Sequence, residues 1–272
     1  MKKLFAVLCT FALLTGCAAG KGDDKTITVG VSPQPHGEIL NAVREEIEAK
    51  GYKLEIKEFT DYVMPNEALS EGSLDANYFQ HVPYLNNYNE EKGTDLVSAG
   101  AIHYEPFAIY PGKNHEVNKN LTVNDIPEGA IIGVPNDGSN EARALQLLES
   151  LGIIKLKEDA GFLATKNDIV ENPKNVDIRE LNAESIPAQL PDLDYGIING
   201  NYALGAGLSD NACVYEDVNS IGLQTYANVV AVRKGEENSE KTKVLLEALT
   251  SDKAVQFIQD TYGDAVVSVV EK

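Results

Sequence analysis

Two polar residues at the expected start of a helix carry chemistry suited to binding an anion. In "VPNDGSNEARAL", residues 134–145, we expect a strand to end at Pro135 and a helix to begin near Asn140. The first backbone amides of a helix lack intrahelical partners and carry the positive end of its dipole. Arg143 follows three residues after Asn140, so both side chains can lie on one face. An exposed helix start beside a forked guanidinium suits a small anion, especially a carboxylate held through two hydrogen bonds.

The same arginine also has a simpler interpretation. Many arginines near helix starts are surface residues that form weak ion pairs with nearby acidic side chains. The residues alone therefore leave both interpretations of Arg143 open. The acidic partners within reach along the sequence are Asp137, Glu141 and Glu149.

A second cluster of chemically useful residues lies in "NYFQHVPYL", residues 77–85. Phe79, His81 and Tyr84 can wall an apolar slot with polar edges, which is a common form of small-molecule site. The alternative is that these aromatic residues belong to the hydrophobic core and that His81 is a structural histidine. Taken alone, the spacing favours the core.

Composition and motifs argue against several classes of function. The chain has 272 residues, 43% of them hydrophobic and 24% charged, as in a folded globular protein. Its net charge of −19 is unsuited to binding nucleic acid, which needs basic surfaces. We find no G-x-S-x-G, H-E-x-x-H, P-loop or C-x-x-C motif, and the four histidines are scattered. We therefore expect no enzyme, no metal and no cofactor.

The first residues are typical of a bacterial lipoprotein signal. A basic start at Lys2 and Lys3 precedes an apolar run that is too short to span a bilayer. The run ends in "LTGC", which resembles the lipobox that a signal peptidase cuts before its cysteine. We predict a signal peptide over residues 1–16, lipidation of Cys17 with several acyl chains, and a polar tether over residues 17–25. The alternative is an ordinary secreted protein with Cys17 as a spare thiol.

The three cysteines predict a fold without disulfide bonds. Cys9 is removed with the signal peptide and Cys17 is lipidated, so Cys213 remains alone. An exported protein without disulfide bonds must derive its stability from a hydrophobic core.

Alternating hydrophobic patterns predict an α/β fold. Expected strands and helices follow one another along most of the chain, an order that favours parallel sheets covered by helices. Ser185 is expected to cap one short helix. The expected strands cover residues 27–32, 52–59, 130–135, 175–181 and 195–200, and the expected helices cover residues 37–51, 65–72, 140–152, 183–190, 240–250 and 252–262.

The pattern occurs twice and leaves a remainder at the end of the chain. This is expected when a chain enters a second lobe and later returns to complete the first. We predict one lobe from residues 26–110 and 225–272 and another from residues 111–224. A ligand would bind in the cleft between them, near the carboxyl ends of the strands. One continuous α/β domain is the alternative.

Five segments resemble the NlpA lipoprotein family, the methionine-binding lipoproteins of ABC importers. They occur in the order and spacing of the family and extend over essentially the whole mature chain. The segments are "FTDYVMPNEALSEGSLDANYFQHVPYL", "HYEPFAIYPGK", "GVPNDGSNEARAL", "ENPKNVDIREL" and "IINGNYALGAGL".

The resemblance implies a fold, a ligand and a set of ligand-binding residues. The fold would be the two-lobed periplasmic-binding-protein fold (type II-like), each lobe a sheet flanked by helices. The protein would be a lipid-anchored monomer on the extracytoplasmic side of the membrane, in the periplasm or at the cell surface. It would pass methionine to a permease and an ATPase. In this family the thioether would be surrounded by Tyr62, Phe79, His81 and Tyr84, the α-carboxylate would be held by Arg143 with Asn140 beside it, and the amino and carboxylate groups would bond to Asn199 and Asn228.

At three positions the sequence departs from the family pattern, and these departures leave more than one possible ligand. Val82 occupies a position where lysine is common, Ala142 one where glycine is common, and Ala188 one where arginine is frequent. None of them replaces an implied ligand contact. D-methionine, a methionine-containing dipeptide and another apolar amino acid therefore remain alternatives to L-methionine. Two alternatives belong to other classes of function: an enzyme with His81 as general base, and a surface adhesin or scaffold.

Overall fold

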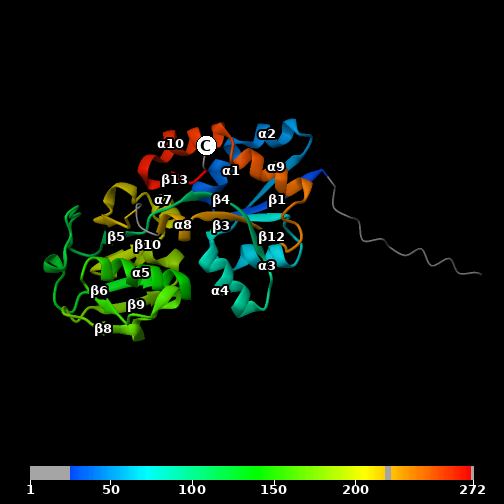
Figure 1. Ribbon diagram of the computed structural model, residues 1–272. Helices are drawn as coiled ribbons and strands as arrows, with labels where there is room; N and C mark the ends of the chain where they lie inside the picture. Colours follow the sequence, from blue (N-terminus) through cyan, green and yellow to red (C-terminus); the bar gives the residue numbers. More distant parts are fainter. Residues whose placement is uncertain (1–24, 218–221, 271–272) are drawn as a thin grey trace, which may run out of the picture.

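Two β-sheets, each flanked by helices, divide the chain into two lobes (Figure 1). The computed structural model describes residues 25–217 and 222–270. The predicted signal peptide, Cys17 and nearly all of the predicted tether lie outside these ranges. Within them, no helix combines the length and the apolar character needed to cross a bilayer.

The first lobe is built on a six-stranded sheet with the order β13-β4-β12-β3-β1-β2. Its central strands are buried, and their aliphatic side chains pack against helices near both ends of the chain. The strands are β1 (Thr26–Val31), β2 (Lys53–Glu58), β3 (Ala76–His81), β4 (Val97–Tyr104), β12 (Asn228–Val232) and β13 (Val267–Ser268), and the helices are α1 (Glu38–Ala42), α2 (Arg44–Ala49), α3 (Met64–Ser70), α4 (Val82–Lys92), α9 (Glu240–Leu249) and α10 (Asp252–Tyr262).

The second lobe is built on a five-stranded sheet with the order β11-β5-β10-β6-β9. Its largest hydrophobic cluster lies between this sheet and α5. The strands are β5 (Ala108–Pro111), β6 (Ile131–Pro135), β9 (Asp177–Leu181), β10 (Tyr195–Ile198) and β11 (Val214–Tyr215), beside a small ribbon of β7 (Lys155–Leu156) and β8 (Ile169–Glu171); the helices are α5 (Gly138–Ser150), α6 (Ile186–Gln189), α7 (Gly200–Gly205) and α8 (Gly222–Thr225).

The predicted helix over residues 37–51 is confirmed as a helical segment but is divided in two. Four large apolar residues at helical spacing are fully buried against the first sheet: Ile39, Leu40, Val43 and Ile47. Val43 leaves helical geometry, with φ −101° and ψ 10°, and separates α1 from α2. The hydrophobic period therefore predicted the buried face correctly, but not the break within it.

The prediction of parallel sheets is correct for only part of each sheet. β1 pairs in parallel with β2 and β3, and β6 pairs in parallel with β9 and β10. β4, β5 and β12 instead run antiparallel to their neighbours. β4 leads into β5 in the other lobe, and β12 brings the chain back. These strands therefore join their sheets without the crossover helix that a parallel connection needs.

The chain changes sheets between Tyr104 and Ala108. The predicted lobe boundary at residue 110 falls inside β5, which pairs with β10 and β11 of the second sheet. The chain returns between α8 and β12, near the second predicted boundary. The short peptide after Tyr104 is thus a connection between the lobes.

The predicted role of Ser185 as a helix cap is wrong. Its hydroxyl donates to the carbonyl of Asn182 at 2.7 Å and accepts from the side chain of Gln189 at 2.7 Å. A turn of 3₁₀-helix over Ala183–Ser185 runs directly into α6, so the amide of Ile186 already has a backbone acceptor. A side-chain cap is therefore unnecessary at this position.

Candidate functional site

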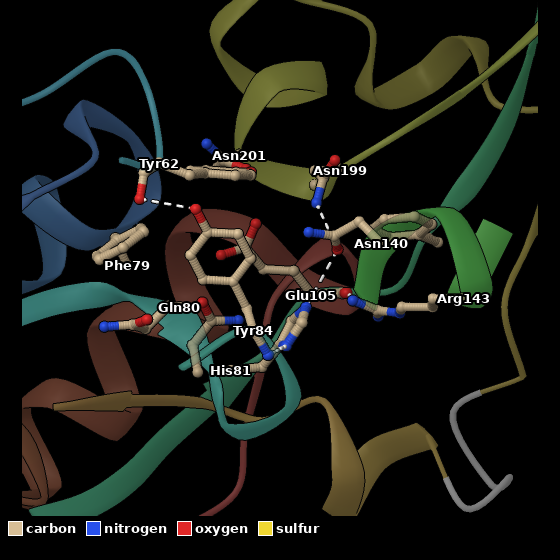
Figure 2. Close-up of a pocket in the computed structure, with 13 residues that line it drawn as sticks. Tyr62, Phe79, Gln80, His81, Tyr84, Glu105, Asn140, Arg143, Asn199 and Asn201 are labelled. Atoms are coloured by element: carbon tan, nitrogen blue, oxygen red, sulfur yellow. Dashed lines mark hydrogen bonds between the residues drawn. The ribbon is translucent and has the colours of Figure 1, made fainter. Parts of the chain in front are cut away.

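A pocket of about 330 Å³ lies between the two lobes (Figure 2). This volume includes space that is open to solvent, and the enclosed part is small, about 20 Å³. Every residue predicted to bind ligand lines the pocket: Tyr62, Phe79, His81, Tyr84, Asn140, Arg143, Asn199 and Asn228. Five further residues, which were not predicted from the sequence, also line it: Gln80, Glu105, Phe107, Gly200 and Asn201.

The segment "NYFQHVPYL" forms a strand end and a helix start. β3 ends at His81, and α4 begins at Val82 with Pro83 in its first turn, where proline is well tolerated. The Nδ1 atom of His81 accepts the backbone N–H of Tyr84 at 3.1 Å and so caps the helix. Its Nε2 atom therefore carries the proton and donates to Oδ1 of Asn140 in the other lobe at 3.1 Å.

His81 is neutral in this environment. Burial, followed by the charge of Arg143, lowers the pKa of His81 to about 3. A neutral imidazole with one donor and one acceptor fits the bonds that it makes. The residue thus joins α4 to the second lobe and forms part of the pocket wall.

Three aromatic rings of the first lobe form an apolar wall. The ring centroids of Tyr62 and Phe79, and those of Tyr62 and Tyr84, are 5.7 Å apart. Phe79 and Tyr84 also pack with leucines beneath the pocket. The Tyr84 hydroxyl donates to the backbone carbonyl of Tyr62 at 2.9 Å, which fixes the ring of Tyr84 (Figure 2). The two interpretations from the sequence do not exclude each other, because the rings belong to a core cluster and also line the pocket.

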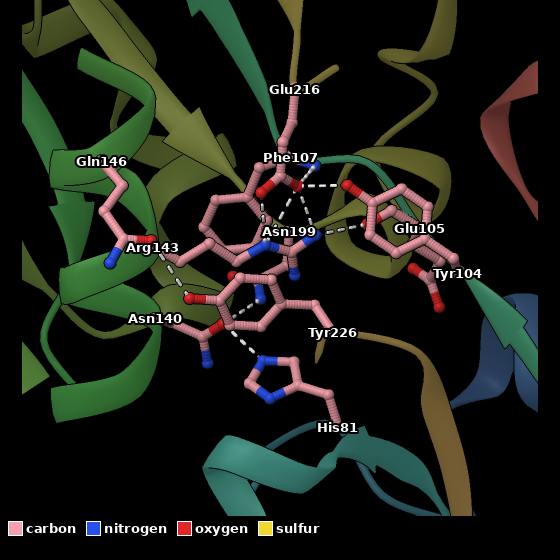
Figure 3. A network of polar contacts seen from close by, with 10 residues as sticks. All are labelled: His81, Tyr104, Glu105, Phe107, Asn140, Arg143, Gln146, Asn199, Glu216 and Tyr226. Atoms are coloured by element: carbon pink, nitrogen blue, oxygen red, sulfur yellow. Dashed lines mark hydrogen bonds and ion pairs between the residues drawn. The ribbon is translucent and has the colours of Figure 1, made fainter. Parts of the chain in front are cut away.

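Arg143 is buried, and its partner is a residue that sequence analysis did not identify. Its Nε and Nη2 atoms donate to Glu216 at 3.1 and 2.6 Å, and Nη2 also donates to the carbonyl of Glu105 at 2.9 Å (Figure 3). The guanidinium lies over the rings of Phe107 and Tyr226, 4.2 and 4.4 Å from their centroids. The alternative of a surface arginine paired with a neighbour on its own helix is wrong.

The pairing also determines the charge of Glu216. Burial opposes its ionisation, but the Arg143 guanidinium and the hydroxyl of Tyr104 outweigh burial, so the pKa of Glu216 lies below its ordinary value. The edge of the guanidinium that would grip a carboxylate through two hydrogen bonds is therefore occupied within the protein.

The start of α5 is not an open anion site. The helix begins at Gly138, and the carboxylate of Asp137 accepts from the backbone N–H and the side-chain amide of Asn140 at 3.0 and 2.9 Å. The expected exposed helix start is thus already capped by an acidic side chain. What this turn presents to the pocket is the side chain of Asn140.

Asparagines of the second lobe provide hydrogen-bonding groups at the pocket. Oδ1 of Asn140 accepts from His81 and from Nδ2 of Asn199, the latter at 3.2 Å (Figure 2). Oδ1 of Asn199 is buried and has no hydrogen-bond partner among the described residues. A buried acceptor without a partner costs about 1–3 kcal/mol, so a ligand that donates a hydrogen bond is expected here.

Glu105 lies beside a cluster of buried histidines. Its Oε1 atom is 2.8 Å from Nε2 of His103 and 3.4 Å from Nε2 of His36, which also contacts Oδ1 of Asn228 at 3.0 Å. The sequence indicates part of this cluster, because "HYE" on a strand places the side chains of His103 and Glu105 on the same face. The contact with His36, far away in the sequence, had no such signal.

His36, His103 and Glu105 form the only group of potential metal ligands found within the described ranges. Two imidazoles and a carboxylate suit Zn²⁺. Each Nε2 atom faces oxygen acceptors, however, and so carries the proton that a metal would displace. As arranged, the cluster is a hydrogen-bonded group around a carboxylate.

The fold and site together define a substrate-binding protein that holds a small ligand between two α/β lobes. Residues 27–270 match the NlpA lipoprotein family, and the chain belongs to this family, as its motifs predicted. It is 40% identical to "Methionine-binding lipoprotein MetQ" of Bacillus subtilis, over the full length of both chains.

Solved structures support the predicted fold. A nutrient-binding protein from Burkholderia cenocepacia bound to methionine is similar, with a TM-score of 0.82, 40% identity, and coverage of 89% of this chain and 99% of that one. A lipoprotein from Ruminococcus gnavus shares 50% identity, with a TM-score of 0.85, covering 90% of this chain and 99% of that one. The prediction of a two-lobed α/β binding protein is confirmed.

Proposed function

We propose that this protein captures methionine in the interlobe cleft and delivers it to an ABC importer made of a permease and an ATPase. The observation that carries the proposal is the pocket itself. An aromatic wall from one lobe faces two groups of the other lobe: a buried arginine, and an asparagine oxygen that has no hydrogen-bond partner among the described residues. An amino acid with an apolar side chain matches both halves of this surface. Family membership and the methionine-bound neighbour support the same ligand.

The thioether would lie against Tyr62, Phe79 and Tyr84, with His81 at the edge of the wall. Aromatic rings suit the polarisable sulfur of methionine. Burying a methionine side chain contributes about 1.5–3 kcal/mol, and each charge-assisted hydrogen bond contributes a similar amount. A few such contacts, less the cost of association, give affinity in the micromolar range or tighter.

The charged end of methionine would lie among Arg143, Asn140, Asn199 and Asn228. The carboxylate of Glu216 accepts hydrogen bonds from Nε and Nη2 of Arg143, and the backbone carbonyl of Glu105 accepts another from Nη2. We therefore propose that the ligand carboxylate accepts from Nη1. The unpartnered Oδ1 of Asn199 would accept from the α-ammonium. This arrangement replaces the two-bond grip expected from the sequence with a single contact from the arginine.

Hydrogen bonds between the lobes stabilise the closed cleft. Tyr62 donates to Oδ1 of Asn201 at 2.6 Å, and the hydroxyl of Tyr202 donates to the carbonyl of Thr60 at 3.1 Å. We predict that Tyr62→Phe weakens methionine binding about 2- to 10-fold, because it removes one bond formed on closure. Calorimetric titration measures the change. Tyr88→Phe, at a buried tyrosine outside the pocket, is the matched control, and an equal loss in both variants would contradict the prediction.

Another ligand and another class of function would each be revealed by a different experiment. A methionine-containing dipeptide, D-methionine or another apolar amino acid would displace bound L-methionine in competition. We propose that the protein is not an enzyme, since the family and its relatives are substrate-binding proteins. Turnover of a bound amino acid would favour an enzyme. An adhesin or scaffold would not need buried polar groups around Arg143.

We further propose that Cys17 carries the lipid anchor and holds a monomeric protein on the extracytoplasmic face of the membrane. Cys17→Ser should release the protein from the membrane fraction, because several acyl chains are needed for stable anchoring. Cell fractionation followed by immunoblotting measures this. Cys213→Ser, at the buried cysteine of the second lobe, should leave the protein membrane-bound. Membrane retention of Cys17→Ser would refute the lipid anchor.

A further inference from the structure

We propose that Glu105 is the anionic receptor for the amino group of the ligand, and that His36 and His103 act as neutral donors whose hydrogen bonds favour its ionised form. This inference rests on the proposed function and extends it. It assigns the charge that selects an α-amino acid over a plain carboxylic acid. Four observations support it.

The first observation is the direction of the hydrogen bonds around Glu105. Nε2 of His103 faces the Glu105 carboxylate at 2.8 Å, so this nitrogen carries a proton and donates. Nε2 of His36 faces Oε1 of Glu105 and Oδ1 of Asn228, both acceptors, so it carries a proton as well. Its Nδ1 atom is buried without a hydrogen-bond partner in the described chain, as expected for the bare nitrogen of a neutral imidazole.

The second observation is the charge of the two imidazoles. Burial lowers the pKa of His36 to about 4 and that of His103 to about 3, so both are neutral near pH 7. They therefore supply hydrogen bonds to Glu105 without neutralising its charge. The ion pairs that Glu105 makes within the described residues are with these two histidines, whereas Arg143 pairs with Glu216. Within the described residues the carboxylate is thus left without a charged partner in direct contact, although the charge of the nearby Arg143 also favours its ionised form.

The third observation is the unused capacity of the carboxylate. An ionised carboxylate can accept about four hydrogen bonds. Three donors approach Glu105: the two imidazoles and the backbone N–H of Asn201. An ammonium group of the ligand would supply a fourth bond together with the missing positive charge.

The fourth observation is the position of Glu105 beside Asn199. Glu105 lines the pocket (Figure 2) and lies against the backbone of Gly200, where an added Cβ atom would be 2.7 Å from Oε2 of Glu105. The glycine thus allows the carboxylate to approach the segment that carries the unpartnered Oδ1 of Asn199. Two acceptors, one of them charged, are brought to one side of the pocket, as an ammonium group requires.

The inference is tested with a pair of ligands that differ in the amino group. Methionine and its des-amino analogue, 4-(methylthio)butanoate, are titrated calorimetrically into the wild-type protein and Glu105→Gln, after each protein has been stripped of bound ligand. Glu105→Gln removes the charge and preserves the size of the side chain. We expect methionine binding to weaken about 10- to 100-fold and binding of the analogue to change less than 3-fold.

The controls separate this inference from the proposed function. Glu141→Gln, at a buried glutamate outside the pocket, should leave both affinities unchanged. An equal loss for both ligands in Glu105→Gln, or no loss for methionine, would overturn the role of Glu105 while leaving the methionine function intact. Failure of the wild-type protein to bind methionine would overturn both. If Glu105→Gln does not fold, Glu105→Asp is used, which retains the charge but moves it away from the ligand. It should weaken binding of methionine more than binding of the analogue.

Discussion

Replacing Arg143 with alanine is expected to abolish tight methionine binding and to lower the free energy of unfolding by about 3–5 kcal/mol. The guanidinium is buried, pairs with Glu216 at 2.6 Å and lies between two aromatic rings. Removing one member of a buried ion pair leaves the other charge without compensation, and this costs about 3–5 kcal/mol. The loss of the carboxylate contact should weaken binding by at least 10-fold. Urea unfolding and calorimetry measure the two effects separately.

A second substitution distinguishes the structural role of Arg143 from its role in binding. Adding Glu216→Gln to Arg143→Ala removes the uncompensated charge, so part of the lost stability should return while methionine binding stays weak. Arg179→Ala, at an exposed arginine paired with Asp177, should change neither quantity appreciably. Unaltered methionine affinity in Arg143→Ala would place the carboxylate site elsewhere.

Acidification is expected to destabilise the folded protein steeply between pH 6.5 and about pH 4. Burial lowers the pKa of His36 to about 4, and that of His81 and His103 to about 3, whereas an unfolded histidine titrates near pH 6.5. Within this window the unfolded chain binds more protons than the folded protein, so stability falls as the pH falls. Each histidine contributes up to about 1.4 kcal/mol per pH unit to the fall in the free energy of unfolding. The three together contribute up to about 4 kcal/mol per pH unit.

Glu105 acts in the opposite direction. Burial raises the pKa of this carboxyl group, so the folded protein takes up a proton there more readily than the unfolded chain does, and this offsets part of the loss. The measurement is the free energy of unfolding in urea at pH 7, 6 and 5. His103→Gln should reduce the slope near pH 5 by about 1.4 kcal/mol per pH unit. A stability that is the same at pH 7 and pH 5 would be incompatible with three buried neutral histidines.

The parts of the site that sequence predicted well lie on short segments with strong local patterns. Phe79, His81 and Tyr84 are close in the sequence, and a strand end followed by a helix with Pro83 in its first turn brings them together, whereas Tyr62 lies just before α3. Their residue types and the family resemblance identified them before the fold was known. All four line the pocket.

The parts that sequence did not predict depend on contacts between distant segments. Glu216 lies 73 residues from Arg143, and no periodic pattern links the two. The same holds for His36, which contacts Asn228 although the two lie 192 residues apart in the sequence. Local patterns also misjudged the start of α5, where Asp137 occupies the cap that had been expected to remain open for a ligand. Burial and pairing between segments that are distant in the sequence determine the roles of Glu216 and His36, and neither can be read from neighbouring residues.

The lobes show the same division between local and long-range information. Hydrophobic periodicity placed the parallel strands β1, β2, β6 and β9 and the helices that cover them. It did not reveal that β4 and β12 run antiparallel, because strand direction depends on where the chain crosses between the sheets. The crossing next to Tyr104 also delivers Glu105 to the pocket, so the topology and the binding site are linked.

Calorimetric titration of the ligand-free protein with L-methionine tests the central claim most directly. The protein is produced without its signal peptide and lipid, unfolded and refolded to remove bound ligand, and titrated at pH 7. The pocket has an aromatic wall, a buried arginine and one buried acceptor, Oδ1 of Asn199, that has no partner among the described residues. It predicts saturable binding of one methionine per chain, with a Kd in the micromolar range or below. Absence of any heat of binding with methionine, in either stereochemical form, would contradict the account.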